Sequence, residues 1–180
     1  MEQKVLHQCK NSIRIEISTP TSGFYGILKM IEKLSDESDD LPFTSEDIGV
    51  RAEHLKHYIE RLNAMDNSIF LIAKHGDSPI GFGYLEGGKR QRTHHCANLG
   101  LGVLHEYSNI GIGQAVVEQL LSYARSSDSI AKIDLQVLKD NQKAIRLYKK
   151  SGFEVEGISR RALFIKDRFY DYIHMGQIID

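Results

Sequence analysis

The stretch Leu99–Leu121 constrains the fold of this chain more than any other part of the sequence. Apolar residues at its start lead into a short polar turn, which contains Gly111 and Gly113. After the turn, apolar residues recur at the spacing of a helix with one buried face: Val117, Leu120, Leu121 and Ala124. The sequence therefore predicts a strand, a glycine-containing turn and a helix in direct succession.

The turn before this helix is suited to binding an anion. The first turn of a helix has unpaired N–H groups and carries a partial positive charge. Gly111 and Gly113 let the backbone approach a bulky anion, because no Cβ atom stands in the way. The segment from Tyr107 to Val117 has no acidic side chain that would repel a phosphate. We interpret the turn as a pyrophosphate cradle.

The composition fits one globular domain. The chain has 180 residues, of which 41% are hydrophobic and 26% charged, enough for a substantial core. A net charge of −1 argues against a nucleic-acid partner held by a general electrostatic field, although it leaves a local basic patch open. The sequence shows no signal-peptide core and no apolar run of membrane-spanning length, and Cys9 and Cys96 are its only cysteines. We expect one cytoplasmic domain over residues 1–180, without a membrane partner.

The rest of the chain alternates strand and helix patterns around the glycine turn. Strands are expected at Ser12–Ile17, Ser68–Lys74, Ile80–Glu86, Ala97–Val103, Lys132–Val137, Phe153–Ile165 and Arg168–Ile178. Helices are expected over Gly23–Leu34, from Ser45 to Met65, after the glycine turn, and over Asn141–Ser151. We therefore expect an α/β (α+β) fold with about four helices and a mixed, mostly antiparallel sheet of about seven strands. One parallel crossover runs through the glycine-turn helix.

Some local features have competing explanations. The acidic run Ser35–Asp40 is interpreted as an exposed loop, because no spacing of metal ligands stands out in it. Gly100 and Gly102 lie inside an expected strand, which suggests either a β-bulge or the close approach of a ligand. The adjacent histidines of His94–His95 do not have the spacing of metal ligands, so no metal site is expected.

Three segments carry patterns that belong together. Gly102–Leu121 contains the glycine turn, and Leu135–Gly157 contains Asn141, a short helix with Tyr148, and a Gly-Phe pair entering a strand. The chain ends in Ala162–Ile179. Together these segments resemble the GNAT superfamily of acetyl-CoA-dependent N-acetyltransferases, and the last is similar to the final hairpin of its ribosomal-protein and diamine acetyltransferase branches.

The resemblance implies a GNAT-like acyl-CoA N-acyltransferase fold and an enzyme of the acyltransferase class. Such an enzyme moves an acetyl group from acetyl-CoA to a primary amine by direct attack in a ternary complex. The amine would belong to a small molecule, a polyamine or a peptide. The family often pairs through edge strands, which implies a homodimer as one option.

The resemblance also implies a cofactor site. Pantetheine would lie along the strand before the turn, against backbone groups of Leu101, Gly102 and Val103, with an amide near Val103 as the oxyanion donor. The pyrophosphate would be held by Ser108, Asn109, Ile110, Gly111, Ile112, Gly113 and Gln114. Asn141 would cap its helix and also touch the cofactor.

One position departs from the family's pattern. The family usually has Arg or Gln three residues before the first glycine of the loop, and this chain has Ser108. One side-chain contact with phosphate is therefore shortened or lost, and Asn109 or Gln114 is expected to compensate.

Tyr148 and Glu86 are the catalytic candidates. A phenol of pKa about 10 is suited to protonating a departing thiolate of pKa about 8.5, and the family uses the matching tyrosine as that general acid. The alternative for Tyr148 is a packing role beside Ala144 and Leu147. Glu86, at a strand end, is the best side-chain candidate for the base that deprotonates the amine, ahead of the His94–His95 pair.

Two further interpretations stay open at this point. One is a non-catalytic acyl-CoA-binding module, whereas Val116 in place of a third glycine argues against a dinucleotide-binding oxidoreductase. The other concerns the substrate. The basic loop Gly87–Thr93 would suit an acidic peptide or a phosphorylated small molecule, and the acidic run Ser35–Asp40 would suit a polyamine, but both segments are interpreted first as solvated surface. Tyr170, Asp171 and Tyr172 are candidates for the substrate mouth.

Overall fold

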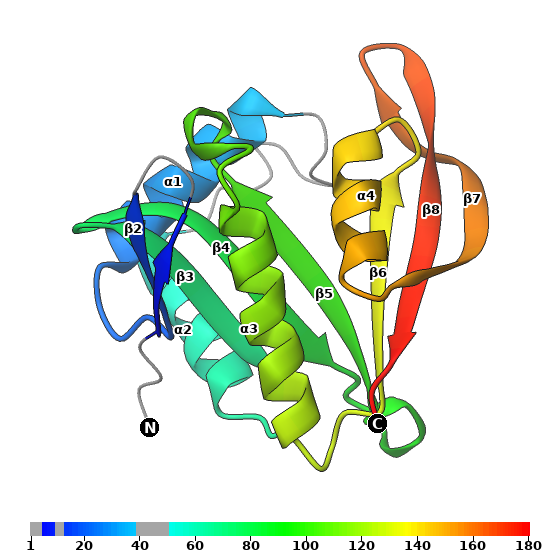
Figure 1. Cartoon of the computed structure of the whole chain (residues 1–180), viewed down its shortest axis with the longest axis horizontal. Coiled ribbons are helices and arrows are strands. Elements are labelled where there is room, and N and C mark those ends of the chain that lie inside the picture. Colours follow the sequence, from blue (N-terminus) through cyan, green and yellow to red (C-terminus); the bar gives the residue numbers. More distant parts are fainter. Residues whose placement is uncertain (1–4, 10–12, 39–50) are drawn as a thin grey trace.

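The computed structural model describes residues 5–9, 13–38 and 51–180, which form one mixed sheet with helices on both faces (Figure 1). The sheet order is β1-β2-β3-β4-β5-β6-β8-β7. Its strands are β1 (Val5–Gln8), β2 (Arg14–Ser18), β3 (Ile69–His75), β4 (Ser78–Gly87), β5 (Cys96–Val103), β6 (Lys132–Leu138), β7 (Glu154–Ile165) and β8 (Arg168–Ile178). The helices are α1 (Phe24–Glu37), α2 (Ala52–Asn63), α3 (Ile112–Ser126) and α4 (Gln142–Lys150).

The two halves of the sheet meet at a single short parallel pairing. β5 pairs with β6 only at Cys96, Ala97 and Asn98, and every other neighbouring pair of strands is antiparallel. Beyond Asn98, β5 keeps its pairing with β4, while β6 keeps its pairing with β8. The two strands therefore diverge, as the gap between them in Figure 1 shows.

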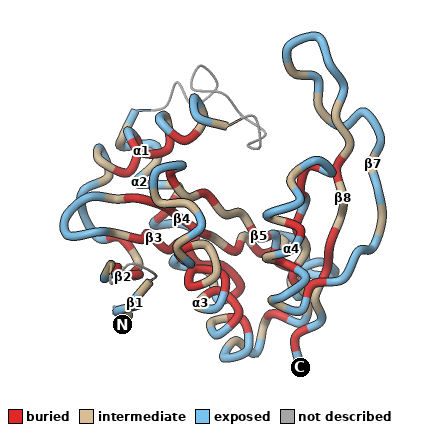
Figure 2. The backbone as a smooth tube through the Cα atoms, turned by 45° about the horizontal axis from the view of Figure 1, so that its top comes forward, coloured by how far each residue is buried: buried red, intermediate tan, exposed pale blue. Residues whose placement is uncertain are grey.

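Helices cover the two faces of the sheet with separate apolar cores. α3 and α4 pack on one face, where the core includes Val116, Leu120, Ile145 and Met175. α1 and α2 pack on the other face, against aromatic side chains of β3 and β4. Figure 2 shows the buried positions concentrated in α3 and the central strands, whereas β7 is largely exposed. None of the described helices is long and apolar enough to cross a membrane.

The expected strands are all present, and β1 is an additional strand that pairs with β2. The expectation of a loop was wrong for the first part of the acidic run, because Ser35–Glu37 continues α1. Its last turn is held by a tertiary contact, since Glu37 accepts a hydrogen bond of 2.9 Å from the His105 N–H. Asp39 and Asp40 lie outside the described residues, as does the expected start of the second helix at Ser45.

For Gly100 and Gly102 the structure excludes the β-bulge and adds a packing explanation, while the close approach of a ligand stays a prediction. The register between β4 and β5 is continuous, so no bulge is present there. An added Cβ at Gly100 would meet the Tyr84 ring at 2.2 Å, and one at Gly102 would meet the Phe82 ring at 2.7 Å. The two glycines of β5 therefore leave room for two aromatic rings of the neighbouring strand β4, which pack over them.

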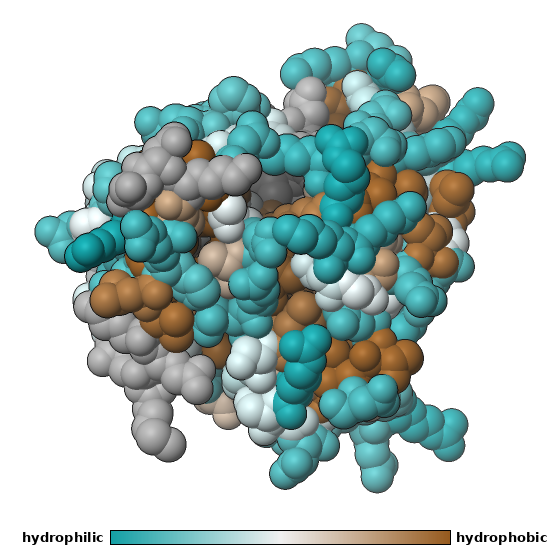
Figure 3. Space-filling view, in the orientation of Figure 1, coloured by the Kyte–Doolittle hydropathy of each residue, from teal (hydrophilic) through white to brown (hydrophobic). Residues whose placement is uncertain are grey.

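The last hairpin extends the sheet beyond α4. Five large apolar side chains of β7 and β8 are exposed: Val155, Ile158, Phe164, Phe169 and Ile178. Figure 3 shows brown side chains of this kind along the right side of the molecule, among the hydrophilic ones. The sheet thus ends in an edge strand that carries apolar surface.

Candidate active site

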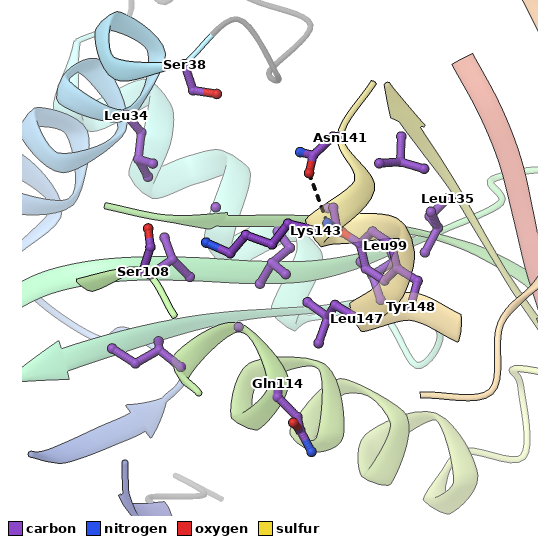
Figure 4. A pocket seen from close by; sticks show the side chains of 18 of the residues that line it. Leu34, Ser38, Leu99, Ser108, Gln114, Leu135, Asn141, Lys143, Leu147 and Tyr148 are labelled. Atoms are coloured by element: carbon purple, nitrogen blue, oxygen red, sulfur yellow. Dashed lines mark hydrogen bonds between the residues drawn. The ribbon is translucent and has the colours of Figure 1, made fainter. Parts of the chain in front are cut away.

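The divergence of β5 and β6 opens a cavity of about 1050 Å³ between the two halves of the sheet (Figure 4). One wall is the segment Leu99–Val103 of β5, and the opposite wall is Leu135–Leu138 of β6. The loop before α3, the first turns of α4 and the end of α1 complete the lining. The cavity therefore passes from the α3–α4 face of the sheet toward the α1–α2 face.

The loop before α3 presents backbone N–H groups to this cavity. Gly111 is the N-cap of α3 and has a φ of 102°, a left-handed conformation that glycine adopts without steric cost. No side chain caps the helix, and its first backbone hydrogen bond runs from the Ala115 N–H to the Gly111 carbonyl at 3.0 Å. Ile112, Gly113 and Gln114 line the cavity, and the first N–H groups of a helix have no partner within the helix.

The remaining loop residues are placed differently from one another. Asn109 lines the cavity with a φ of 64°, whereas Ile110 packs against the core and is not part of the lining. Ser108 lines the cavity, but its hydroxyl donates to the His105 carbonyl at 2.8 Å. The Gln114 amide is bonded to Glu118 at 2.8 Å and to Lys150 at 3.1 Å. The Gln114 side chain is therefore paired with Glu118 and Lys150 here, and its compensation, or that of Asn109, for the short Ser108 side chain stays a prediction.

α4 brings two predicted residues to the cavity. Asn141 caps the helix, since its Oδ1 accepts the Ala144 N–H at 2.9 Å, and it also lines the cavity. Tyr148 is only 7% exposed, and its ring makes an edge contact with Phe153 at a centroid distance of 5.8 Å. Figure 4 places Tyr148 at the end of the cavity where Leu99 and Leu135 lie. The burial of Tyr148 is consistent with a packing role, and its position on the cavity wall is consistent with a role as general acid.

Glu86 lies behind the cavity wall. It is opposite Asn98 in the β4–β5 register, and Asn98 and Tyr84 line the cavity, whereas Glu86 does not. The Tyr58 hydroxyl donates to its Oε2 at 3.0 Å, and its Oε1 lies 3.4 Å from both Arg61 and Lys89. Burial raises the pKa of the Tyr58 phenol, and the charge of Glu86 raises it further. Glu86 therefore meets the cavity only through neighbouring groups or water.

The other candidates for the base and the mouth are separated by the fold. His94 does not line the cavity, because it is bonded to Asp66 at 3.2 Å and to Asn67 at 3.1 Å. Tyr172 is buried and lines the cavity, but Tyr170 and Asp171 do not. Asp171 accepts the Arg161 N–H at 3.0 Å, and this bond and Lys139 lower the pKa of its carboxyl. No group of three His, Cys, Asp or Glu side chains within residues 5–9, 13–38 and 51–180 is arranged to hold a metal ion.

Sequence reasoning missed several polar residues of the lining, among them Tyr84, Asn98, Gln136 and Lys143. Tyr84 precedes Glu86 by two positions on β4, so strand alternation alone puts the two on one face. Lys143 precedes Leu147 by one helical turn, which is a signal that the sequence did contain. Asn98 and Gln136 line the same cavity because β5 and β6 pair in parallel beside it.

Comparisons with known protein sequences agree with this geometry. Residues 31–153 match the family described as "Acetyltransferase (GNAT) family". The chain is 29% identical over 90 residues to the L-amino acid N-acetyltransferase AaaT of Escherichia coli (strain K12), covering 50% of this chain and 56% of that protein. It is 30% identical over 83 residues to the spermidine N(1)-acetyltransferase of the same organism, covering 46% and 45%. The matches thus span about half the length of these relatives.

Solved structures extend the likeness to nearly the whole fold. A GNAT-family acetyltransferase from Streptococcus pneumoniae superimposes with a TM-score of 0.89 at 25% identity, covering 92% of this chain and 99% of that one. A second structure, YncA from Salmonella typhimurium with its cofactor acetyl-CoA, gives a TM-score of 0.79 at 14% identity, with coverage of 92% and 94%. The family match spans more than half of the chain, and the chain therefore belongs to the GNAT acetyltransferase family.

Proposed function

We propose that this protein is an N-acetyltransferase that transfers the acetyl group of acetyl-CoA to a primary amine. The observation that carries the proposal is the cavity itself. It joins the unpaired amides of α3, the free edge of β5 and the phenol of Tyr148 in one space. Family membership supports the reaction type, and the acetyl-CoA in the YncA structure supports the co-substrate.

We expect acetyl-CoA to bind in one orientation, with its pyrophosphate at α3 and its pantetheine along β5. The pyrophosphate belongs at the N-terminus of α3, where Gly111, Ile112 and Gly113 present backbone amides. Pantetheine then runs along Leu99–Val103, whose edge toward β6 is unpaired and can receive an extended chain like an added strand. In this arrangement an amide near Val103 is the donor that polarises the thioester carbonyl.

The reaction needs a nitrogen–carbon bond to form and a carbon–sulfur bond to break. The neutral amine attacks the thioester carbonyl, and the tetrahedral intermediate then releases the CoA thiolate. Tyr148 donates its phenolic proton to that sulfur, and the buried position of its ring keeps bulk water from competing. The packing role and the acid role of Tyr148 are compatible, since the ring packs while the hydroxyl reacts.

The amine must lose a proton, and we infer that the Glu86 carboxylate accepts it through a bridging water. Glu86 lies behind Tyr84 and Asn98, which line the cavity, so a water between these groups connects the carboxylate to the amine. Arg61 and Lys89 both lie 3.4 Å from one oxygen of this carboxylate. The attacking nitrogen must be neutral, so we expect the rate to rise with pH as the amine itself deprotonates.

The acceptor is a primary amine of a small molecule, a polyamine or a peptide. The part of the cavity toward α1 is lined by uncharged polar groups, among them Tyr84, Asn98, Gln136 and Tyr172, and by the acidic residue Glu37 at the end of α1. Two of the relatives are named for acting on L-amino acids and on spermidine, which supports a small amine. The free thiols of Cys9 and Cys96 support a cytoplasmic setting, and the apolar edge at β7 supports a homodimer.

The test is release of CoA thiol from acetyl-CoA on addition of single amines from a panel of amino acids, polyamines, aminoglycosides and N-terminal peptides. We expect at least one amine to raise thiol release well above the hydrolysis rate. Tight binding of acetyl-CoA with no release for any amine would instead assign the chain to a non-catalytic acyl-CoA-binding module.

A further inference from the structure

The loop that cradles the pyrophosphate contains no cationic side chain. Ser108–Gln114 has neither Lys nor Arg, so its contribution to phosphate binding is restricted to backbone amides and short polar groups. The Ser108 hydroxyl is used by the His105 carbonyl, and the Gln114 amide by Glu118 and Lys150. A pyrophosphate with two negative charges would therefore be neutralised incompletely by this loop alone.

A cation faces the loop from the other side of the cavity. Lys143 is an exposed residue of α4 that lines the cavity, and it forms no ion pair or hydrogen bond with any residue that the structure describes. Figure 4 shows its side chain extended across the cavity, with the ammonium group directed toward Ser108. Lys150, which also lines the cavity, is bonded to Gln114 instead.

The position of Lys143 in its helix is unfavourable for stability. It is the second residue of α4, whose first turn has no acidic side chain, and a positive charge there opposes the helix dipole. The need for an N-cap is already met by Asn141. Neither the helix dipole nor the cap therefore accounts for a cation at this position.

We propose that Lys143 binds the pyrophosphate of acetyl-CoA and supplies the positive charge that the loop Ser108–Gln114 lacks. The proposal rests on the proposed function and names a binding residue for the same site. Lysine serves here as a mobile point charge, and its long side chain reaches the phosphate from α4 across the cavity. The contact exists in the ground state and in the transition state alike, so it lowers KM for acetyl-CoA without changing kcat.

The experiment compares Lys143→Gln with Lys149→Gln, an exposed lysine of the same helix that does not line the cavity. Calorimetry measures Kd for CoA, and steady-state kinetics measure KM and kcat with acetyl-CoA and with acetyl-pantetheine, which has no phosphates. We expect Lys143→Gln to raise Kd and KM about tenfold, with kcat within about twofold and no change for acetyl-pantetheine. Lys149→Gln should match the parent protein, and both variants should keep its melting temperature.

Other ligands separate the alternatives. With dephospho-CoA, which lacks the 3′-phosphate, Lys143→Gln should show the same loss of affinity. If the variant and the parent bound dephospho-CoA equally well, Lys143 would contact the 3′-phosphate instead, which would overturn the proposal. An equal loss with acetyl-pantetheine would assign Lys143 a structural role and also overturn it. If the parent protein binds CoA and Lys143→Gln binds it equally well, this inference fails alone. If the parent does not bind CoA, the proposed function fails with it.

A second substitution tests whether Ser108 and Lys143 face the same phosphate. Ser108→Arg adds a cation on the loop, which we expect to restore CoA affinity in Lys143→Gln and to add less in the parent background. Equal gains in the two backgrounds would mean that the two side chains serve different groups, which contradicts the proposal.

Discussion

The two sides of the cavity are built in different ways. The side that we propose for the cofactor consists of the β5 edge, the loop before α3 and the N-terminal turns of α4, and it would bind mainly through backbone amides. The side that we propose for the acceptor includes Tyr84, Asn98, Gln136 and Tyr172, with Glu86 behind them, and it would bind through side chains from four strands. Backbone geometry is preserved through many side-chain changes, whereas a side-chain constellation changes with each substitution. The cofactor side therefore defines the family, and the acceptor side defines the individual substrate.

The largest expected effect comes from the residue where the two sides meet. Tyr148→Phe keeps the ring and its contact with Phe153 but removes the phenolic proton. We expect kcat to fall about a hundredfold, because a positioned general acid contributes about that much. Calorimetry should show Kd for CoA within about twofold of the parent value. Unchanged kcat would mean that another group protonates the thiolate, and would break the assignment of Tyr148.

Substitutions of Gly111 and Gly113 test the stability and the CoA affinity of the proposed cofactor side. Gly111→Ala forces a Cβ onto a left-handed residue and should lower stability by about 1–2 kcal/mol, measured by denaturant unfolding. Gly113→Ala meets only ordinary contacts, with Leu147 at 3.5 Å and Leu101 at 3.6 Å, so the fold should tolerate it. We nevertheless expect Gly113→Ala to weaken CoA binding about tenfold, because the methyl group enters the space of the pyrophosphate.

For Gly113→Ala, full CoA affinity with full stability would show that the pyrophosphate stays clear of this residue. That result would remove the reason for a glycine at the second position of the turn.

Glu86→Gln tests the acceptor side. We expect kcat to fall about tenfold at neutral pH, less than for a base in direct contact, because the carboxylate acts through water. Kd for CoA should not change, since Glu86 lies away from the loop before α3. Glu60→Gln, an exposed residue of α2, is the matched control. A parallel loss of CoA affinity in Glu86→Gln would contradict the separation of the two sides.

The smallest expected effect concerns Asp171, which the sequence suggested for the substrate mouth and the structure places in a bracing role. The Arg161 N–H and Lys139 lower the pKa of its carboxyl, so the ionised form stabilises the folded state. This contribution is present above about pH 4, the range of the unfolded carboxyl, and is lost as the pH falls through the lower folded pKa.

Asp171→Asn should therefore melt slightly below the parent protein at pH 7, and the gap should close at pH 3. Acetyl transfer at pH 7 should be unchanged. A drop in kcat/KM for the amine at equal stability would show that Asp171 contributes to binding of the acceptor amine.

The sequence predicted the local structure of the glycine turn and of α4 well, because its signals are local. Gly111 and the helix after it, the Asn141 cap and the position of Tyr148 on α4 each follow from residues a few positions apart. The acceptor side was harder to predict, because Asn98 and Gln136 line one cavity only through the parallel pairing of β5 with β6. The bulge expected at Gly100 and Gly102 was wrong, since the rings that fill the space beside these glycines come from the separate strand β4.

The most direct test of the account is acetyl transfer itself, measured by mass spectrometry with isotopically labelled acetyl-CoA and the amine panel. The parent protein should produce one singly acetylated amine carrying the label, and Tyr148→Phe should produce it about a hundredfold more slowly while binding CoA equally well. Absence of any labelled amine, with CoA bound tightly by both proteins, would contradict the central claim that this cavity is a site of catalysis.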